Sequence, residues 1–280
     1  MRKTCMFAFS LLSLLLLSLV GIAAAYNENY IHVLYQSSNS PPTIDGTYIV
    51  DDDWIASGKE EFGDGAAFHD QWLMSPNIYC CIVEVTDNTT DAGDKLTICF
   101  DGTAAGGSNP PDGGPNPTQY DKKLEVTGHP GSQTIQWYIG NGSDWVTATA
   151  SGDLLELAQS LTTTPTIEPD HYVYEMILNF HDDTSLGSPL VGYEWAQFVS
   201  YYDEDTGETQ QWPPADATPA GSPDVPENWG GITYASNANP TVTIPEPLTI
   251  GAIVLLSSAA LVISFYWLRK KSTNRMVKHN

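Results

Sequence analysis

Tryptophans in loop-like sequence are the side chains of this chain that best suit ligand binding. Seven of its eight tryptophans lie between two hydrophobic ends, and Trp72, Trp212 and Trp229 fall among Pro, Gln and Asn residues. The apolar face of a pyranose ring stacks on an aromatic side chain, while its hydroxyl groups need hydrogen-bond partners nearby. These three tryptophans are the candidate sugar-binding residues, and burial is the alternative for each of them. Trp54 and Trp195 are expected in the core, the commoner place for a large aromatic side chain.

Acidic clusters suggest a second kind of chemistry, the binding of a hard cation. Ca²⁺ takes several carboxylate and carbonyl oxygens, and Asp203, Asp205 and Glu208 alternate along one short segment. The D-x-D-x-D-G…E pattern of an EF-hand is missing, and Asp-Thr-Gly is also ordinary turn sequence. Calcium is therefore the candidate cofactor with these three residues as predicted ligands, and chance clustering among 34 acidic residues is the alternative.

Haem is a disfavoured alternative ligand. The sequence has no C-x-x-C-H motif for covalent attachment, although it has side chains of the type that ligate haem iron: His69, Met74, His129, His171 and Met176. No G-x-S-x-G, H-E-x-x-H, P-loop or dinucleotide-binding motif is present. Acid pairs such as Glu60-Glu61 are too common to mark a glycosidase, which needs two carboxylates at a defined separation. We therefore predict that the chain is not an enzyme.

Cysteines and sequons indicate covalent chemistry on an exported chain. If residues 78–87 and 95–101 form a hairpin, Cys99 lies across from Cys80 or Cys81, because adjacent strand residues face opposite sides. One disulfide with one free thiol, or three reduced and buried thiols, are both open. Asn88 and Asn141 begin N-x-S/T sequons at turn-like positions and are predicted glycosylation sites, with an unused sequon as the alternative.

Two hydrophobic runs enclose an acidic middle. Residues 1–25 are a predicted secretory signal, with a basic start, a largely apolar stretch and three alanines for cleavage; an uncleaved membrane anchor is the alternative. Residues 248–268 are uncharged and long enough to cross a bilayer as a helix, and the basic segment 269–280 predicts a cytoplasmic C-terminus. The middle therefore lies outside the cell.

The charge of the middle limits its partners. It holds all 34 acidic residues against four lysines, a formal charge of −30 within a chain total of −23. Nucleic acid is not an expected partner, because its phosphate backbone would be repelled. With 41% hydrophobic and 11% aromatic residues the chain is expected to form a packed core.

A three-part arrangement surrounds the second hydrophobic run. Pro245-Glu246-Pro247 precedes the run and Arg269-Lys270-Lys271 follows it. This order resembles the PEP-CTERM sorting signal and its archaeal PEF-CTERM relatives. The resemblance implies that a sorting transpeptidase of the exosortase or archaeosortase type removes the tail during surface anchoring. The alternative is an ordinary single-pass anchor, and both interpretations place the chain at the extracellular face of the cell membrane.

Short segments rich in β-branched and aromatic residues alternate with Gly, Pro, Asn and Asp clusters along the middle of the chain. Strands are predicted at 31–36, 77–87, 95–101, 122–127, 134–139, 145–150, 172–180, 193–202 and 231–235. Residues 153–161 (DLLELAQSL) are the one predicted helix. This spacing indicates a single antiparallel β-sandwich, jelly-roll-like, over residues 26–235. Residues 236–247 then form a stalk that includes the Pro-Glu-Pro motif.

Several motifs resemble those of a known group of domains. Pro42-Thr43-Ile44-Asp45-Gly46, followed by Asp51-Asp52-Asp53-Trp54, resembles the opening of family 9 carbohydrate-binding modules and related DOMON-like sandwiches. Segments 78–88 and 94–102 fit the group's pattern of a strand ending V-x-D, a turn and a strand ending F-D, and the stretch from Trp195 to Tyr202 with Trp229-Gly230 resembles the closing part. The resemblance implies a β-sandwich fold. It does not select a ligand, because members bind sugars, bind haem or serve as surface modules.

These observations predict a non-enzymatic binding module at the cell surface. The expected partners are the membrane, an extracellular polysaccharide or envelope glycan, and the sorting transpeptidase. A structural envelope protein without a small ligand is the rival hypothesis, and a haem-binding electron-transfer domain is a further alternative.

Overall fold

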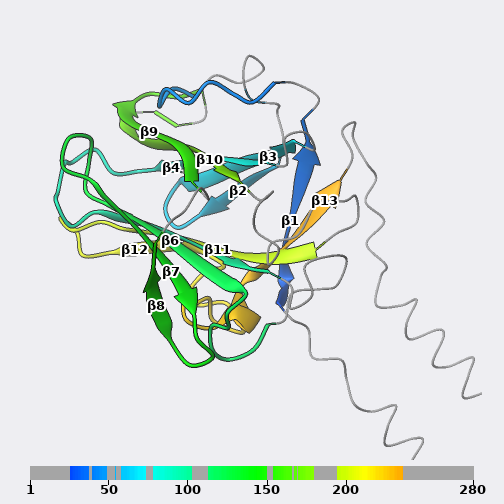
Figure 1. Cartoon of the computed structure of the whole chain (residues 1–280). Coiled ribbons are helices and arrows are strands. Elements are labelled where there is room, and N and C mark those ends of the chain that lie inside the picture. Colours follow the sequence, from blue (N-terminus) through cyan, green and yellow to red (C-terminus); the bar gives the residue numbers. More distant parts are fainter. Residues whose placement is uncertain are drawn as a thin grey trace, which may run out of the picture. The chain divides into compact units, whose positions relative to one another are not determined.

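The computed structural model describes residues 26–37, 40–48, 54, 58–73, 78–102, 113–149, 154–165, 167–168, 170–179 and 194–235 (Figure 1). In these ranges the regular structure is β-strand apart from one 3₁₀ turn, η1 at Pro226–Asn228, which confirms the predicted all-β class. None of the described residues forms a helix long and apolar enough to span a membrane. The predicted signal (1–25), stalk, Pro-Glu-Pro motif, hydrophobic span and basic tail lie outside the described residues.

Thirteen strands form one sheet. They are β1 Asn27–Gln36, β2 Lys59–Phe62, β3 Ala66–Leu73, β4 Ile78–Val85, β5 Lys95–Asp101, β6 Asp121–Thr127, β7 Thr134–Gly140, β8 Trp145–Ala148, β9 Leu154–Thr162, β10 His171–Asn179, β11 Glu194–Tyr202, β12 Thr209–Trp212 and β13 Gly230–Ala235. The order across the sheet is β8-β7-β6-β5-β11-β13-β1-β3-β4-β10-β9, with β12 on β11 and β2 on β3.

The sheet is mixed, which corrects the prediction of a purely antiparallel fold. β1 pairs in parallel with β13 on one side and with β3 on the other. The other pairings are antiparallel, so β1 joins two antiparallel halves. Because both of its neighbours run in the same direction as β1, neither can reach it through a tight hairpin. Local turn signals in the sequence therefore carry no information about these two pairings.

The predicted helix at 153–161 is wrong, because this segment is strand β9. Leu and Glu are good helix formers, but residues 154–162 pair with β10 from Leu154↔Leu178 to Thr162↔His171. Backbone pairing along a neighbouring strand outweighs a propensity of tenths of a kcal/mol per residue. The structure also adds three strands that were not predicted: β2, β3 and β12.

One main core lies between the two halves of the sheet. Figure 1 shows β3, β4, β10 and β9 on one side of it and β5 to β8 with β11 on the other, and both groups contribute side chains to the same apolar cluster. Trp195 and Trp54 are 1% and 2% exposed, which confirms that they belong to the interior. Every residue of β4 is buried, since alternate residues face the main core and a second cluster formed with Tyr48 and Trp54. A strand covered on both faces has a nearly continuous apolar sequence.

Glu175 on β10 explains the Ile-Asp-Gly motif near the N-terminus. Its carboxylate accepts hydrogen bonds from the backbone N–H of Asp45 (2.9 Å) and Gly46 (2.7 Å) and from the Trp54 indole (3.1 Å). Gly46 has a φ of +84°, and an added Cβ would lie 3.0 Å from Cβ of Ser160. Glycine thus permits both the left-handed backbone and the close approach to β9. The motif fastens the segment before β2 onto the sheet.

Candidate functional site

The three tryptophans predicted to bind sugar are in the interior. Trp72, Trp212 and Trp229 are 0%, 2% and 0% exposed. Trp72 meets Tyr234 edge to face, with ring centroids 5.3 Å apart, and Trp212 meets Phe68 in the same way at 5.2 Å. A sugar ring needs a free aromatic face, and these side chains do not present one. The prediction of an exposed platform at these positions is therefore corrected. The three residues lie on or beside strands, and their large aromatic side chains are packed in the interior.

The residues predicted to bind calcium form a turn. Oδ1 of Asp203 accepts hydrogen bonds from the backbone N–H of Asp205 (2.9 Å) and Thr206 (3.2 Å). Asp205 and Glu208 are exposed. In the described part of the chain, three or more potential metal-ligating side chains gather elsewhere, at Asp87, Asp94 and His129. The alternating acids at 203–208 thus lie in the β11–β12 turn, and calcium binding by them stays a prediction.

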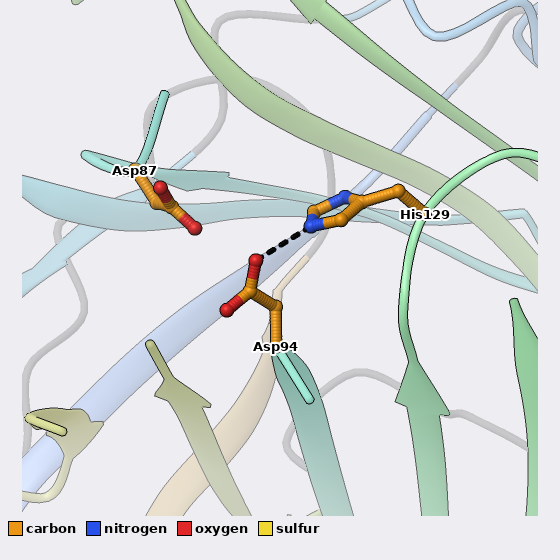
Figure 2. Close-up of side chains that lie close together, drawn as sticks. All are labelled: Asp87, Asp94 and His129. Atoms are coloured by element: carbon orange, nitrogen blue, oxygen red, sulfur yellow. Dashed lines mark hydrogen bonds and ion pairs between the residues drawn. The ribbon is translucent and has the colours of Figure 1, made fainter. Parts of the chain in front are cut away.

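Asp87, Asp94 and His129 converge from two turns at one end of the core, the β4–β5 turn and the β6–β7 turn (Figure 2). Asp87 follows β4, Asp94 precedes β5, and His129 follows β6. One ligand atom from each residue lies within 4.8 Å of the other two. The residues are 6%, 0% and 3% exposed, so two carboxylates and an imidazole are held together out of water. We call this group the Asp87–Asp94–His129 cluster.

Hydrogen bonds hold each member of the cluster in place. His129 Nε2 lies 2.6 Å from Oδ2 of Asp94, and the His129 ring stacks on Tyr172 with centroids 3.9 Å apart. Oδ1 of Asp94 accepts from the backbone N–H of Glu204 at 2.9 Å. Asp87 accepts from the Tyr201 hydroxyl at 2.5 Å; burial, the neighbouring Tyr174 and this carboxylate raise the pKa of Tyr201. The cluster thereby links the turns after β4, β6 and β11.

Two further buried carboxylates, those of Glu84 and Asp70, contact the other buried histidines of the described residues. The Glu84 carboxylate lies 2.7 Å from Nε2 of His69 and 3.5 Å from Nε2 of His171, and it accepts a hydrogen bond from the Thr164 hydroxyl. Ring nitrogens of His69 and His171, two of the three histidines named as haem-ligand candidates, are thus directed at one carboxylate. Met176, another candidate, packs in the main core, and Met74 lies outside the described residues.

The second buried carboxylate, Asp70, contacts His32 at 2.5 Å and accepts from the Tyr79 hydroxyl at 3.1 Å. Nδ1 of the same histidine lies 3.2 Å from Glu60. Burial acts to lower the pKa of His32, but the two carboxylates together raise it to about 9.

The sites predicted for covalent chemistry are placed as follows. Cys80, Cys81 and Cys99 are all free and buried, so the reduced alternative holds; burial raises the pKa of each thiol. Asn88 and Asn141 are exposed in turns, and glycosylation there stays a prediction.

A partly exposed aromatic group lies on the outer face of β6, β7 and β8. We call it the Trp145 patch and define it by five residues: Lys123, Glu125, Tyr138, Trp145 and Asp224. The Lys123 ammonium lies 4.6 Å from the ring centroid of Tyr138 and 5.0 Å from that of Trp145, and 3.5 Å from Glu125. Trp145 Nε1 donates to Asp224 at 3.0 Å.

The ring of Trp145 packs against that of Trp229. Its ring is parallel to that of buried Trp229, with centroids 6.3 Å apart and an angle of 2° between the planes. Trp229 is itself anchored by a hydrogen bond from Nε1 to the carbonyl of Ser222 at 2.7 Å. Trp229, proposed from sequence as a platform, thus supports the more exposed tryptophan above it. Sequence reasoning missed Trp145, because strand residues alternate between faces and only the pairing with β7 shows which face is open.

Comparisons with known proteins add one similarity. No family model matches the chain, and no curated protein matches it. Among solved structures, the chain is similar to a family 9 carbohydrate-binding module from Caldicellulosiruptor kristjanssonii in complex with glucose, with a TM-score of 0.48 and 16% identity over 75% of this chain and 99% of that chain.

Proposed function

We propose that this chain is a non-enzymatic surface module that binds carbohydrate through the Trp145 patch. The observation that carries the proposal is a partly exposed tryptophan whose ring plane is set by a parallel tryptophan beneath it. Tyr138 lies on the neighbouring strand and is also partly exposed. The two rings offer apolar surface for the C–H groups of a sugar.

The charged residues of the patch supply the polar half of such a site. A pyranose ring presents hydroxyl groups around its rim, and these need donors and acceptors beside the aromatic surface. Lys123 is a donor, and Glu125 and Asp224 are acceptors. All three contact the aromatic rings or each other within 5.0 Å. Because these contacts exist without ligand, little side-chain freedom remains to be lost on binding.

An array of immobilised glycans and insoluble polysaccharides, screened with the full chain in mild detergent, tests the proposal. The array is run with and without calcium, and hits are followed by titration calorimetry. We expect Trp145→Ala to weaken binding about 30-fold or more, the effect of removing a hot-spot side chain worth at least about 2 kcal/mol. Tyr138→Ala serves as a second variant on the same patch, and circular dichroism checks that both fold.

Leu161→Ala is the matched control. Leu161 is an apolar side chain that is 45% exposed, and it lies on β9, at the opposite end of the strand order from β8. Its removal should leave sugar binding unchanged. A folded wild-type chain that binds no glycan, or a Trp145→Ala chain that binds as well as wild type, contradicts the proposal.

The position of the module at the cell surface is part of the same proposal. The apolar run at 248–268, the Pro-Glu-Pro motif before it and the basic tail after it support a tether at the extracellular face of the membrane. Either the span is retained or a sorting transpeptidase removes it. The mass of the protein isolated from its native membrane distinguishes the two, because removal of the tail shortens the chain at the Pro-Glu-Pro motif.

A further inference from the structure

We infer that the Asp87–Asp94–His129 cluster binds a divalent transition-metal ion of the Zn²⁺ type. Two carboxylates and one imidazole form a ligand set common for such ions, with bonds of about 2.0–2.2 Å. Four ligands at that distance lie roughly 3.4 Å apart in a tetrahedron. The three ligand atoms already lie within 4.8 Å of one another, so side-chain shifts on the order of an ångström would complete the contacts.

The charge of the cluster calls for a cation. Asp87 and Asp94 are 6% and 0% exposed, and burying two carboxylates side by side is costly unless a positive charge accompanies them. Among the described residues, no lysine pairs with either aspartate. Backbone N–H groups of Glu204 and Asp91 donate to Asp94, and Thr89 donates to Asp87. Glu204 and Asp91 also carry further negative charge. A divalent ion would balance both buried carboxylates.

A buried hydroxyl supplies an independent sign of a missing ligand. Tyr174 is 0% exposed, and its hydroxyl has no hydrogen-bond partner of normal geometry among the described residues. It lies beside the Tyr201 hydroxyl, which donates to Asp87, and near both aspartates: burial raises the pKa of Tyr174, a contact with the Tyr201 hydroxyl lowers it, and the charges of Asp94 and Asp87 raise it. A metal ion, or a water bound to it, would give this hydroxyl a partner.

The second nitrogen of His129 has the environment of a metal-bound imidazole. Nδ1 lies 2.9 Å from the side-chain amide nitrogen of Gln159, whose Oε1 is buried without a partner. A half-turn of the amide would let Oε1 accept a hydrogen bond from the Nδ1–H group. Nε2, which faces Asp94 and Asp87 in Figure 2, would then offer its lone pair to the metal. Ligating histidines usually donate their other N–H to such an oxygen.

The imidazole favours a transition metal over calcium. Ca²⁺ prefers six to eight oxygen ligands, whereas imidazole nitrogen suits Zn²⁺ and its neighbours. The cluster offers one nitrogen and two carboxylates, with a tyrosine hydroxyl close by. This assigns a metal chemistry different from the one that the acid-rich sequence suggests.

Metal titration of the full chain tests the inference. The chain, purified in mild detergent and stripped with a chelator, is titrated with ZnSO4 or CaCl2 by calorimetry, and bound metal is counted by mass spectrometry. Wild type should bind Zn²⁺ at the cluster and unfold at a higher temperature with it, and Ca²⁺ should compete only weakly. Co²⁺ should give visible absorption bands of a tetrahedral site.

Variants locate the site. His129→Gln should weaken Zn²⁺ binding at least about 100-fold and abolish the Co²⁺ bands, because loss of a ligand costs at least as much as loss of its supporting partner. Gln159→Ala, which removes only the supporting amide, should weaken it about 10-fold to 100-fold and keeps the inference testable if His129→Gln does not fold. Asp203→Asn, in the turn, is the control and should bind as wild type.

Three results would overturn the inference. One is a folded wild-type chain that takes up no Zn²⁺ and gains no thermal stability from it. Another is Zn²⁺ binding that Gln159→Ala and His129→Gln leave unchanged. The third is Ca²⁺ binding as tight as Zn²⁺ binding at the same residues.

Discussion

Raising the pH should destabilise the fold through His32. This imidazole is 1% exposed and lies between Asp70 on β3, 2.5 Å from Nε2, and Glu60 on β2, 3.2 Å from Nδ1. Tyr79 on β4 donates to the far oxygen of the same aspartate. Burial disfavours the imidazolium, but the two carboxylates outweigh it and raise the pKa of His32 from 6.5 to about 9.

The sign and size of the effect follow from that pKa. The folded chain holds the proton more tightly than the unfolded chain, so the contribution to stability is complete below pH 6.5 and is lost as the pH rises through 9. Each pKa unit corresponds to about 1.4 kcal/mol, so the loss is about 3 kcal/mol. With a urea m-value of about 1–3 kcal/mol/M, the unfolding midpoint should fall by about 1–3 M.

Urea unfolding followed by circular dichroism from pH 6 to pH 10 measures the loss, and two adjacent glutamates provide matched variants. Glu60→Gln removes one partner of His32 and so lowers the pKa of this histidine in the folded chain. Its midpoint should begin to fall at the same pH as that of wild type, but fall by less and level off at a lower pH. Glu61, the next residue, is exposed and pairs with Lys59, so Glu61→Gln should follow the wild-type profile. A wild-type midpoint that is flat between pH 6.5 and 9, or two variants with the same profile, would refute the reasoning.

Two further predictions concern the interior. Glu175→Ala should lower the free energy of unfolding by about 1–3 kcal/mol, since the N–H groups of Asp45, Gly46 and Trp54 would lose a buried acceptor. Urea unfolding at pH 7 measures this free energy. An unchanged value would show that other contacts hold the Ile-Asp-Gly motif on the sheet. Cys80, Cys81 and Cys99 are free and buried, so a thiol reagent such as DTNB should leave them unmodified in the native chain and modify all three in urea. Fewer thiols after unfolding without reductant would indicate a disulfide.

The strands that could be predicted are those with apolar and β-branched sequence. Residues 95–101 were predicted as a strand and form β5 with the same bounds. β3 was missed because its sequence contains His69, Asp70 and Gln71, which look like loop residues; they are 5%, 0% and 0% exposed. Burial of His69 and Asp70 is stable because a carboxylate and an imidazole from other strands face them. Such partners are 15 or more residues away in the chain, so no local pattern reveals them.

The sequence alone determined the all-β class and the acidic character of the middle of the chain, and it predicts export and anchoring signals at the two ends. These properties depend on composition and on short-range alternation, which act within a few residues. Only the tertiary structure decided which tryptophan stays partly exposed and which aspartates lie beside a histidine. Trp145 and Trp229 are 84 residues apart in the chain, as their numbers show, and yet their rings are parallel. Likewise, Asp87, Asp94 and His129 come together because the β4–β5 turn and the β6–β7 turn lie at the same edge of the core. Side-chain chemistry of this kind depends on which strands pair, and the two parallel pairings of β1 are set by packing across the whole domain.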